Sequence, residues 1–239
     1  MCEQCLPSGY IWSRRGVLVG AAALLAANAL PRSVRAEQKA SPNAIPPAEA
    51  LERLREGNAR YAANAPNERD FSATPAARAE AQFPVAAIVS CSDSRVVPDL
   101  VFDQSPGDLF VVRLAGNIVD DDAYASLEYA VKFLGAPLIL VLGHSNCGAV
   151  AAAIKVVMER AELPGHLPGL IKAIEPAVIA AHGRHPSDML AAAIEENVLH
   201  GMNEMRKDSS IIAEAFEAKT IDIAGGVYDI ATGKVRLLS

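Results

Sequence analysis

The sequence has 239 residues, of which 51% are hydrophobic and 5% aromatic, and its formal net charge at pH 7 is -6. A chain of this length and apolar content can bury a sizeable core as a single domain. The acidic balance argues against a nucleic-acid-binding protein, because phosphate backbones attract basic surfaces, and a small molecule or a protein is the expected partner.

The first 36 residues have the pattern of an export signal. Arg14 and Arg15 precede an Ala-rich apolar run that ends near Leu30, and a polar stretch follows. This order is typical of a twin-arginine signal. The apolar run, about fifteen residues long, is shorter than the roughly twenty of a membrane-spanning helix, which favours a signal over a retained anchor. We therefore expect export to the periplasm in folded form, with no membrane attachment after signal removal.

Residues 37–46 are expected to form a linker, after which a helix begins. Pro47 suits the first turn of a helix, and Leu51 and Leu54 begin an apolar stripe at helical spacing. A stripe this narrow suits packing against another surface. Residues 64–84, which contain several prolines, are expected to be irregular.

From residue 85 onward the pattern alternates between strand and helix. Continuous apolar runs predict buried parallel strands at residues 85–90, 109–114 and 138–142. Helices are expected at residues 124–134, 149–160, 189–207 and 210–218, and a hairpin at 220–228 and 234–238. Residues 163–176, rich in Pro and Gly, have no clear assignment. The pattern predicts a single-domain α/β fold, with a mostly parallel central sheet flanked by helices, a C-terminal antiparallel edge hairpin and an N-terminal helical arm.

Side chains that bind metal ions follow two of the predicted strands. Cys91 comes directly after the first strand, two residues before Asp93, and His144 and Cys147 follow the third. The carboxyl ends of parallel strands meet at one edge of a sheet, where ligands bind. Two thiolates, one imidazole and an open fourth position are the ligand set of catalytic rather than structural zinc. The alternative is a disulfide between the two cysteines, which leaves His144, Asp93 and Arg95 unexplained.

These motifs and the segment between them resemble the β-class carbonic anhydrases. The motifs are Cys91-x-Asp93-Ser94-Arg95 and His144-x-x-Cys147-Gly148. Residues 102–117 resemble the family's intervening segment, and residues 225–233 resemble its C-terminal strand pair. The resemblance marks residues 47–239 as the catalytic domain and implies a homodimer or a multiple of dimers. It also implies that the helix beginning at Pro47 reaches over a partner subunit, whereas simple packing on its own core is the alternative.

The resemblance implies a zinc enzyme that interconverts carbon dioxide and bicarbonate by attack of zinc-bound hydroxide. Asp93 and Arg95 would form the catalytic pair, with Arg95 keeping Asp93 ionised. When this pair breaks, Asp93 would become a conditional fourth zinc ligand in a closed state. Gly148, Val96 and Phe102 are the candidates for substrate binding. The alternatives are a hydrolase of carbonyl sulfide or carbon disulfide on the same scaffold, and a noncatalytic zinc- or bicarbonate-binding protein.

Other polar residues of the matching segments are expected to be structural. Arg113 and Asp108 are expected to be salt-bridged or solvated at the ends of a strand. Asn117, Tyr228 and Asp229 are expected to fix loops or to lie in the core.

Overall fold

The computed structural model describes residues 41–69 and 79–238. The predicted export signal and residues 37–40 of the predicted linker lie outside this range. The elements in chain order are α2 (Pro47–Ala62), β1 (Ala86–Ser90), α4 (Pro98–Val101), β2 (Leu109–Arg113), the 3₁₀ turn η1 (Ala115–Asn117), α5 (Asp121–Lys132), β3 (Leu138–His144), α6 (Gly148–Glu159), α7 (Leu167–Gly183), α8 (Met189–Asp208), α9 (Ser210–Glu217), β4 (Asp222–Tyr228) and β5 (Val235–Leu238). None of the helices in the described ranges is long and apolar enough to span a bilayer.

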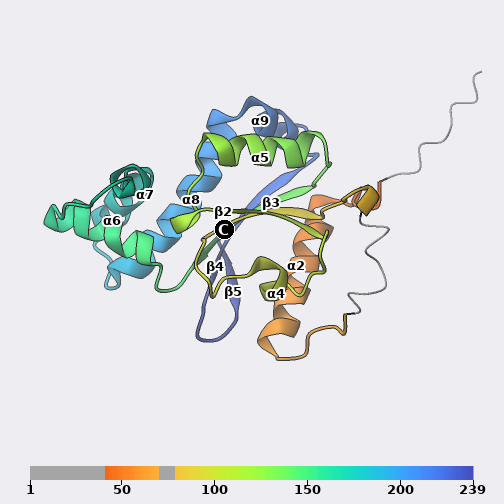
Figure 1. Cartoon of the computed structure of the whole chain (residues 1–239), viewed down its shortest axis with the longest axis horizontal. Coiled ribbons are helices and arrows are strands. Elements are labelled where there is room, and N and C mark those ends of the chain that lie inside the picture. Colours follow the sequence, from red (N-terminus) through yellow and green to blue (C-terminus); the bar gives the residue numbers. More distant parts are fainter. Residues whose placement is uncertain (1–40, 70–78, 239) are drawn as a thin grey trace, which may run out of the picture. The chain divides into compact units, whose positions relative to one another are not determined.

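Five strands form one sheet in the order β2-β1-β3-β4-β5, at the centre of Figure 1. β1 pairs in parallel with β2 and β3, and β3 pairs in parallel with β4. β5 is antiparallel to β4. The mostly parallel sheet and its antiparallel C-terminal strand are confirmed. The register pairs Ser90 at the end of β1 with Leu142 of β3, so the residues that follow the two strands emerge at the same edge.

The central strands are apolar at every position because both faces of the sheet are covered. On β3, Leu140 and Leu142 belong to a core cluster that includes Leu54 of α2. Ile139 and Val141 point to the other face and belong to a cluster built with α5, α8 and α9. Figure 1 shows α5 and α9 on one side of the sheet and α2 and α4 on the other.

A third core cluster lies among α6, α7 and α8. It contains Cys91 and Cys147, which are 5% and 1% exposed, together with Ile171 and Ile174 of α7 and Ile194 of α8. The two predicted cysteine ligands therefore lie inside an apolar shell rather than on the surface.

The structure adds one helix that the sequence pattern left unassigned. Residues 163–176 contain the first half of α7, whose Ile171 and Ile174 are buried. Pro168 lies in the first turn, where the missing N–H has no helical partner to lose. Pro176 lies inside the helix. The proline and glycine residues that left this segment unassigned thus lie within or beside a helix.

The N-terminal helix α2 contacts the sheet of its own chain. Leu54 is buried in the core, and the amide of Asn58 donates to the carbonyl of Val101 at 3.0 Å. Gly57 lies so close to α4 that a Cβ atom there would be 1.8 Å from the carbonyl oxygen of Phe102. Of the two surfaces considered for this helix, the chain's own core is the one that it contacts here.

Residues 41–46, the described part of the predicted linker, lie against the domain. Asn43 is 1% exposed, and its amide donates to the carbonyls of Pro84 and Leu134 at 3.0 and 2.8 Å. Helix α2 then begins at Pro47, as expected. The packed part of the chain therefore includes Asn43.

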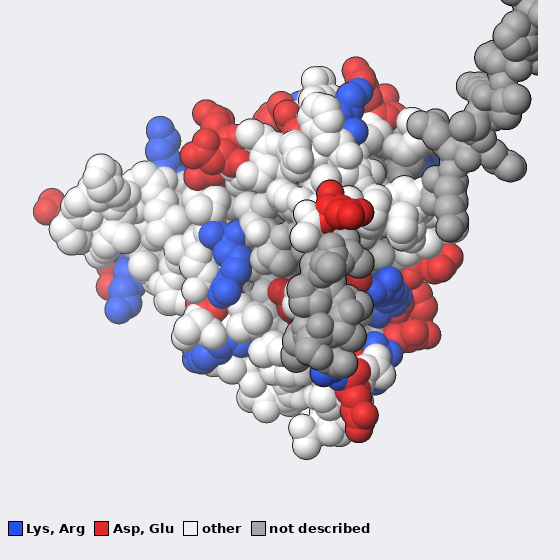
Figure 2. All heavy atoms as spheres, turned by 45° about the vertical axis from the view of Figure 1, so that its right-hand side comes forward, with Lys and Arg blue, Asp and Glu red and all other residues white. Residues whose placement is uncertain are grey.

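Acidic and basic side chains are mixed on the face of the described chain that Figure 2 shows, with uncharged surface between them. Some of the charged side chains form ion pairs, such as Arg53 with Asp108 at 3.0 Å and Arg55 with Glu52 at 2.8 Å. Neither sign of charge dominates the visible face.

Candidate metal centre

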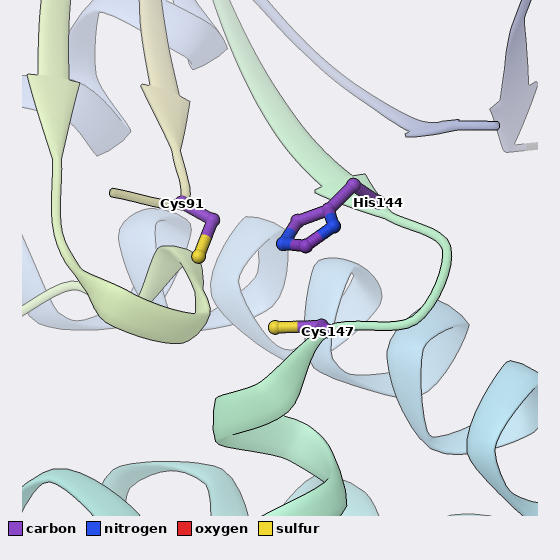
Figure 3. Close-up of side chains that lie close together, drawn as sticks. All are labelled: Cys91, His144 and Cys147. Carbon is purple, nitrogen blue, oxygen red and sulfur yellow. The ribbon is translucent and has the colours of Figure 1, made fainter. Parts of the chain in front are cut away.

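Three side chains that can hold a metal ion meet at the carboxyl ends of β1 and β3, and Figure 3 shows them pointing toward one another. Cys91 follows β1, His144 ends β3, and Cys147 precedes the first residue of α6. Two sulfur atoms and one ring nitrogen lie within 4.8 Å of one another, and all three residues are buried. Both cysteines are free thiols, so the disulfide considered from the sequence is not formed. The structure brings together the three predicted ligands.

The protonation of His144 suits a metal ligand. Its Nδ1 lies 3.0 Å from the carbonyl oxygen of Ser145, so Nδ1 carries the proton and donates it there. Its Nε2 is buried and has no hydrogen-bond partner among the residues that the structure describes. A four-coordinate ion with metal–sulfur bonds of about 2.3 Å holds its ligand atoms roughly 3.5–3.8 Å apart. The two sulfurs and one ring nitrogen, within 4.8 Å of one another, therefore fit three positions of such an ion.

A hydrogen bond couples the thiols of Cys91 and Cys147. The pKa of Cys91 is lowered, first by a hydrogen bond from the Cys147 thiol and also by the N–H of Gly116, although burial opposes the shift. The pKa of Cys147 is raised by the same hydrogen bond and by burial. Because metals bind thiolates, metal binding at this site releases thiol protons.

Asp93 and Arg95 form a bidentate ion pair beside the cluster. Arg95 Nε and Nη2 donate to the two carboxylate oxygens at 2.9 and 2.8 Å. The hydrogen bond from the Arg95 side chain is the main reason that the pKa of Asp93 lies well below its usual value. Asp93 Oδ2 lies 4.0 Å from Nε2 of His144. The ionised carboxylate is thus close to the ligand nitrogen but held by the guanidinium, and its role as a conditional metal ligand stays a prediction.

Arg113 has a different role from the one expected of it. Its Nε donates to the carbonyl of Cys91 at 3.1 Å, and its Nη2 donates to the carbonyl of Asp93 at 2.7 Å. The guanidinium therefore fixes the backbone of the ligand loop instead of being salt-bridged or solvated. Asp108, by contrast, forms an ion pair with Arg53 at 3.0 Å. A salt bridge was one of the two expectations for this residue.

The loop that joins β3 to α6 is tied to the β4–β5 hairpin. The N–H of Ser145 donates to the carbonyl of Tyr228 at 2.9 Å, and its hydroxyl accepts from the N–H of Ile230 at 3.0 Å. Asp229 accepts from Ser145 Oγ at 3.4 Å and from Thr232 Oγ1 at 2.8 Å. Asp229 therefore fixes a loop, and Tyr228, 3% exposed, lies in the core. Both residues are structural, as expected.

One contributor to the site was not singled out from the sequence. The N–H of Gly116 donates to Cys91 Sγ at 3.2 Å. The available signal was a glycine three residues after the end of β2, since glycine allows the close approach of a backbone to a ligand. Asn117, beside it, is 3% exposed and lies in the same turn.

The three residues predicted to bind substrate lie in different surroundings. Val96 and Phe102 are 0% and 2% exposed in the core cluster of α2. Phe102 also lines a groove of about 990 Å³ beside α2 and β5, whose lining contains none of the three metal-binding residues. Gly148 is exposed and begins α6, directly after Cys147. Gly148 thus adjoins the cluster in the chain, and the substrate-binding roles of all three residues stay predictions.

The chain is similar in sequence and in fold to proteins named carbonic anhydrase. The chain matches the carbonic anhydrase family over residues 86–235. It is 36% identical over 206 residues to a protein named carbonic anhydrase from Mycolicibacterium smegmatis. The aligned region covers 83% of this chain and 96% of that protein. A solved β-carbonic anhydrase from Coccomyxa, in complex with acetazolamide, aligns with a TM-score of 0.62 and 28% identity over 80% of this chain and 85% of that one.

A second solved structure, one of two tetrameric β-carbonic anhydrases from Sordaria macrospora, aligns with a TM-score of 0.60 and 27% identity, over 67% of this chain and 83% of that one. The family match covers more than half of the chain and contains every residue of the metal cluster and of the Asp93–Arg95 pair. The chain therefore belongs to the carbonic anhydrase family, and its fold is that of the β class.

Proposed function

We propose that the chain catalyses the reversible hydration of carbon dioxide to bicarbonate and a proton, with a zinc ion held by Cys91, His144 and Cys147. The observation that carries this proposal is the buried cluster of two sulfurs and one imidazole, beside a carboxylate that Arg95 holds. Structural zinc sites use four protein ligands, whereas catalytic sites keep one position open. Membership of the family supports the proposal.

The ligand chemistry favours zinc over the harder divalent cations. Thiolates are soft ligands that select zinc among the common metals, whereas magnesium and calcium prefer oxygen ligands. Two thiolates and a neutral imidazole also balance the charge of a divalent ion. The site is therefore suited to hold zinc without any further charged ligand.

The side chains around the metal position have different roles in the proposed reaction. Zinc, when bound, supplies the Lewis acidity that makes water nucleophilic near neutral pH. Asp93, being ionised, can only accept hydrogen bonds, so it orients the O–H of the attacking water and directs its lone pair toward carbon dioxide. Arg95 keeps that carboxylate in position through two parallel hydrogen bonds. His144 is held in the tautomer that leaves Nε2 free.

Stopped-flow measurement of carbon dioxide hydration tests this proposal. Zinc-loaded protein should hydrate carbon dioxide, chelator-stripped protein should not, and returning zinc should restore the rate. Parallel assays of sulfide release from carbonyl sulfide and carbon disulfide separate the hydrolase alternative. Faster turnover of either sulfur compound than of carbon dioxide, or zinc binding without any hydration, would contradict the proposed reaction.

We further propose that two copies associate through the β2 edge of the sheet. Among the described residues β2 pairs only with β1, which leaves its outer edge open. Beside this edge Phe110, Tyr129 and Phe133 form a row with ring centroids 6.3 and 5.4 Å apart. Phe133 is 75% exposed and Tyr129 47%. A strand edge with exposed aromatic residues favours pairing with a second copy about a two-fold axis.

Sedimentation analysis tests the association. The wild-type chain should sediment as a dimer or a multiple of dimers, and Phe133→Lys should shift the population toward monomer. Ile179→Lys, which alters a 61% exposed residue of α7, is the matched control and should not. A monomeric wild type, or equal effects of the two substitutions, would argue against this interface.

Export through the twin-arginine route, with a periplasmic location, also remains our proposal. It rests on Arg14, Arg15 and the apolar run after them. A reporter fused to residues 1–36 should reach the periplasm, and replacing both arginines by lysine should retain the reporter in the cytoplasm. Export of the doubly substituted fusion would contradict the proposed route.

A further inference from the structure

The turn that carries Gly116 is held in an unusual backbone conformation next to a metal ligand. Gly116 has φ +71°, in the left-handed region that favours glycine. A Cβ at this position would lie 2.7 Å from Cδ1 of Ile174 and 3.1 Å from Cβ of Ala149. In this conformation the N–H of Gly116 donates to Cys91 Sγ at 3.2 Å. The direction of that N–H therefore depends on how the turn is fixed.

One buried side chain from a distant part of the sequence fixes the turn. Asn197, on α8, is 4% exposed, and its Nδ2 donates to the carbonyl oxygen of Gly116 at 2.7 Å. The two residues are 81 positions apart in the chain. Helix α8 packs against β3 and β4 of the sheet, so the asparagine extends from a firmly placed element. Gly116 has no side chain to restrain its own two torsion angles, so this contact adds a restraint on them.

We propose that Asn197 is a positioning residue of the metal centre, which acts through Gly116 to direct a hydrogen bond onto the sulfur of Cys91. The inference rests on the proposed zinc site. A hydrogen bond to a ligand sulfur withdraws electron density from it, and partners of this kind tune ligand basicity and metal affinity. With two thiolates in the ligand set, the bond offsets part of the charge that they donate, and the metal remains the stronger Lewis acid.

The test uses metal binding rather than turnover as its readout. Asn197→Leu keeps a similar volume but removes the donor, whereas Asn197→Gln keeps an amide on a longer side chain. In the cobalt-substituted protein, Asn197→Leu should move the sulfur-to-cobalt charge-transfer band to longer wavelength, because the sulfur lone pair is less stabilised. Its zinc dissociation constant should rise about tenfold, because the turn that holds the Cys91 sulfur in its ligand position is no longer fixed by the asparagine. Asn197→Gln should recover part of both changes.

Asn58→Leu is the matched control. Asn58 is also a buried asparagine whose amide donates to backbone carbonyls, those of Val101 and Gly233 at 3.0 and 2.9 Å. Its replacement should lower the thermal stability and leave the charge-transfer band and the zinc affinity unchanged. A folded Asn197→Leu variant with the wild-type band and zinc affinity would overturn the proposal.

A measurement on the wild-type chain covers the case in which the leucine variant does not fold. In protein loaded with ¹¹³Cd, the amide proton of Gly116 should show scalar coupling to the metal through the sulfur of Cys91. Absence of this coupling would also overturn the proposal. If the protein hydrates carbon dioxide but shows no coupling, only the inference about Asn197 is wrong. If it binds the metal and shows the coupling but does not hydrate carbon dioxide, only the proposed reaction is wrong.

Discussion

At the scale of single residues, Asp93 is the group on which the proposed reaction depends most after the metal ligands. The carboxylate is bound by Arg95 and lies 4.0 Å from the ligand nitrogen of His144. It is therefore placed to orient a water molecule without being a permanent ligand. This distinction between an orienting group and a ligand is testable by substitution.

Asp93→Asn should leave zinc content near one ion per chain and reduce turnover about a hundredfold, the usual scale for a positioned group. The amide presents an N–H₂ group to the Arg95 guanidinium in place of one of the two acceptor oxygens of the carboxylate. Metal analysis and stopped-flow hydration measure the two effects. Asp121→Asn, at an exposed position in the first turn of α5, is the control and should change neither. Loss of zinc from the Asp93 variant would instead make Asp93 an obligate ligand.

The pH dependence of the rate should not follow Asp93. Its pKa lies well below the usual value, mainly because of Arg95, so the carboxylate is ionised throughout the neutral range. Two thiolates donate more charge than the imidazoles of a three-histidine site, in which the bound water has a pKa of about 7. We therefore expect kcat/KM to rise with pH with a midpoint at or above about pH 7. A midpoint well below pH 6 in the stopped-flow profile would be inconsistent with this ligand set.

The three metal ligands and the Asp93–Arg95 pair could be predicted from the sequence, since each side chain has its own chemistry and lies in a short motif. Arg113 and Gly116 could not be assigned their contacts in this way. Arg113 binds carbonyl oxygens and Gly116 offers a backbone N–H. Contacts with the backbone cannot be read from the types of the residues involved. They depend on which loops the fold brings together.

At the scale of elements, the end of α4 is fixed to the segment after α2 by one buried carboxylate. The side chain of Asp103 is fully buried and forms ion pairs with Arg60, at 2.6 Å, and with Arg69. It also accepts from the N–H of Asn67 at 3.1 Å. Burial by itself raises the pKa of Asp103, but these contacts outweigh burial and lower it.

Asp103→Asn should lower the free energy of unfolding by about 3 kcal/mol, because removing one partner of a buried pair leaves the other charges uncompensated. Urea denaturation measures the loss. Asp108→Asn breaks a partly exposed pair with Arg53 and should lower it by less than about 1 kcal/mol. Equal losses for the two variants would show that the burial of Asp103 is not what matters.

The same carboxylate gives the stability a pH dependence with a definite sign. The pKa of Asp103 is lower in the folded chain than in the unfolded one, so its contribution is complete above the unfolded value, about 3.9. That contribution is lost as the pH falls through the lower, folded value. The wild type should therefore lose its advantage over Asp103→Asn in acid and keep it at neutral pH.

The strands could be predicted closely because fully buried parallel strands are apolar at each position. Residues 138–142 were expected to form a strand, and β3 continues two residues further, to His144. Helix α7 was left unassigned because its first half is rich in proline and glycine, although Ile171, Ile174 and Val178 lie at helical spacing. Packing of α7 between α6 and α8 outweighs the local cost of Pro176.

At the scale of the whole molecule, the metal should stabilise a fold that does not depend on it entirely. Cys91 and Cys147 belong to the cluster of α6, α7 and α8. The two clusters on the faces of the sheet contain none of the three metal ligands. A ligand that binds only the folded state, present at about a thousand times its dissociation constant, contributes roughly 4 kcal/mol.

We therefore expect chelator-treated protein to keep its far-ultraviolet circular dichroism at room temperature and to unfold at a lower temperature than the zinc-loaded form. Zinc should restore the transition temperature, and magnesium, as the control, should not, because the ligands are soft. Identical unfolding temperatures with and without zinc would show that the metal does not stabilise the fold. Loss of all secondary structure on chelation would show that the fold depends on the metal entirely.

X-ray absorption spectroscopy of the zinc-loaded protein tests the central claim most directly, because it counts the ligand atoms by type. Two sulfur scatterers at about 2.3 Å, with nitrogen from one imidazole and one further oxygen from solvent at about 2.0–2.2 Å, are the predicted first shell. A first shell without two sulfurs, or with a third sulfur or a second imidazole in place of the oxygen, would contradict an open catalytic site at Cys91, His144 and Cys147.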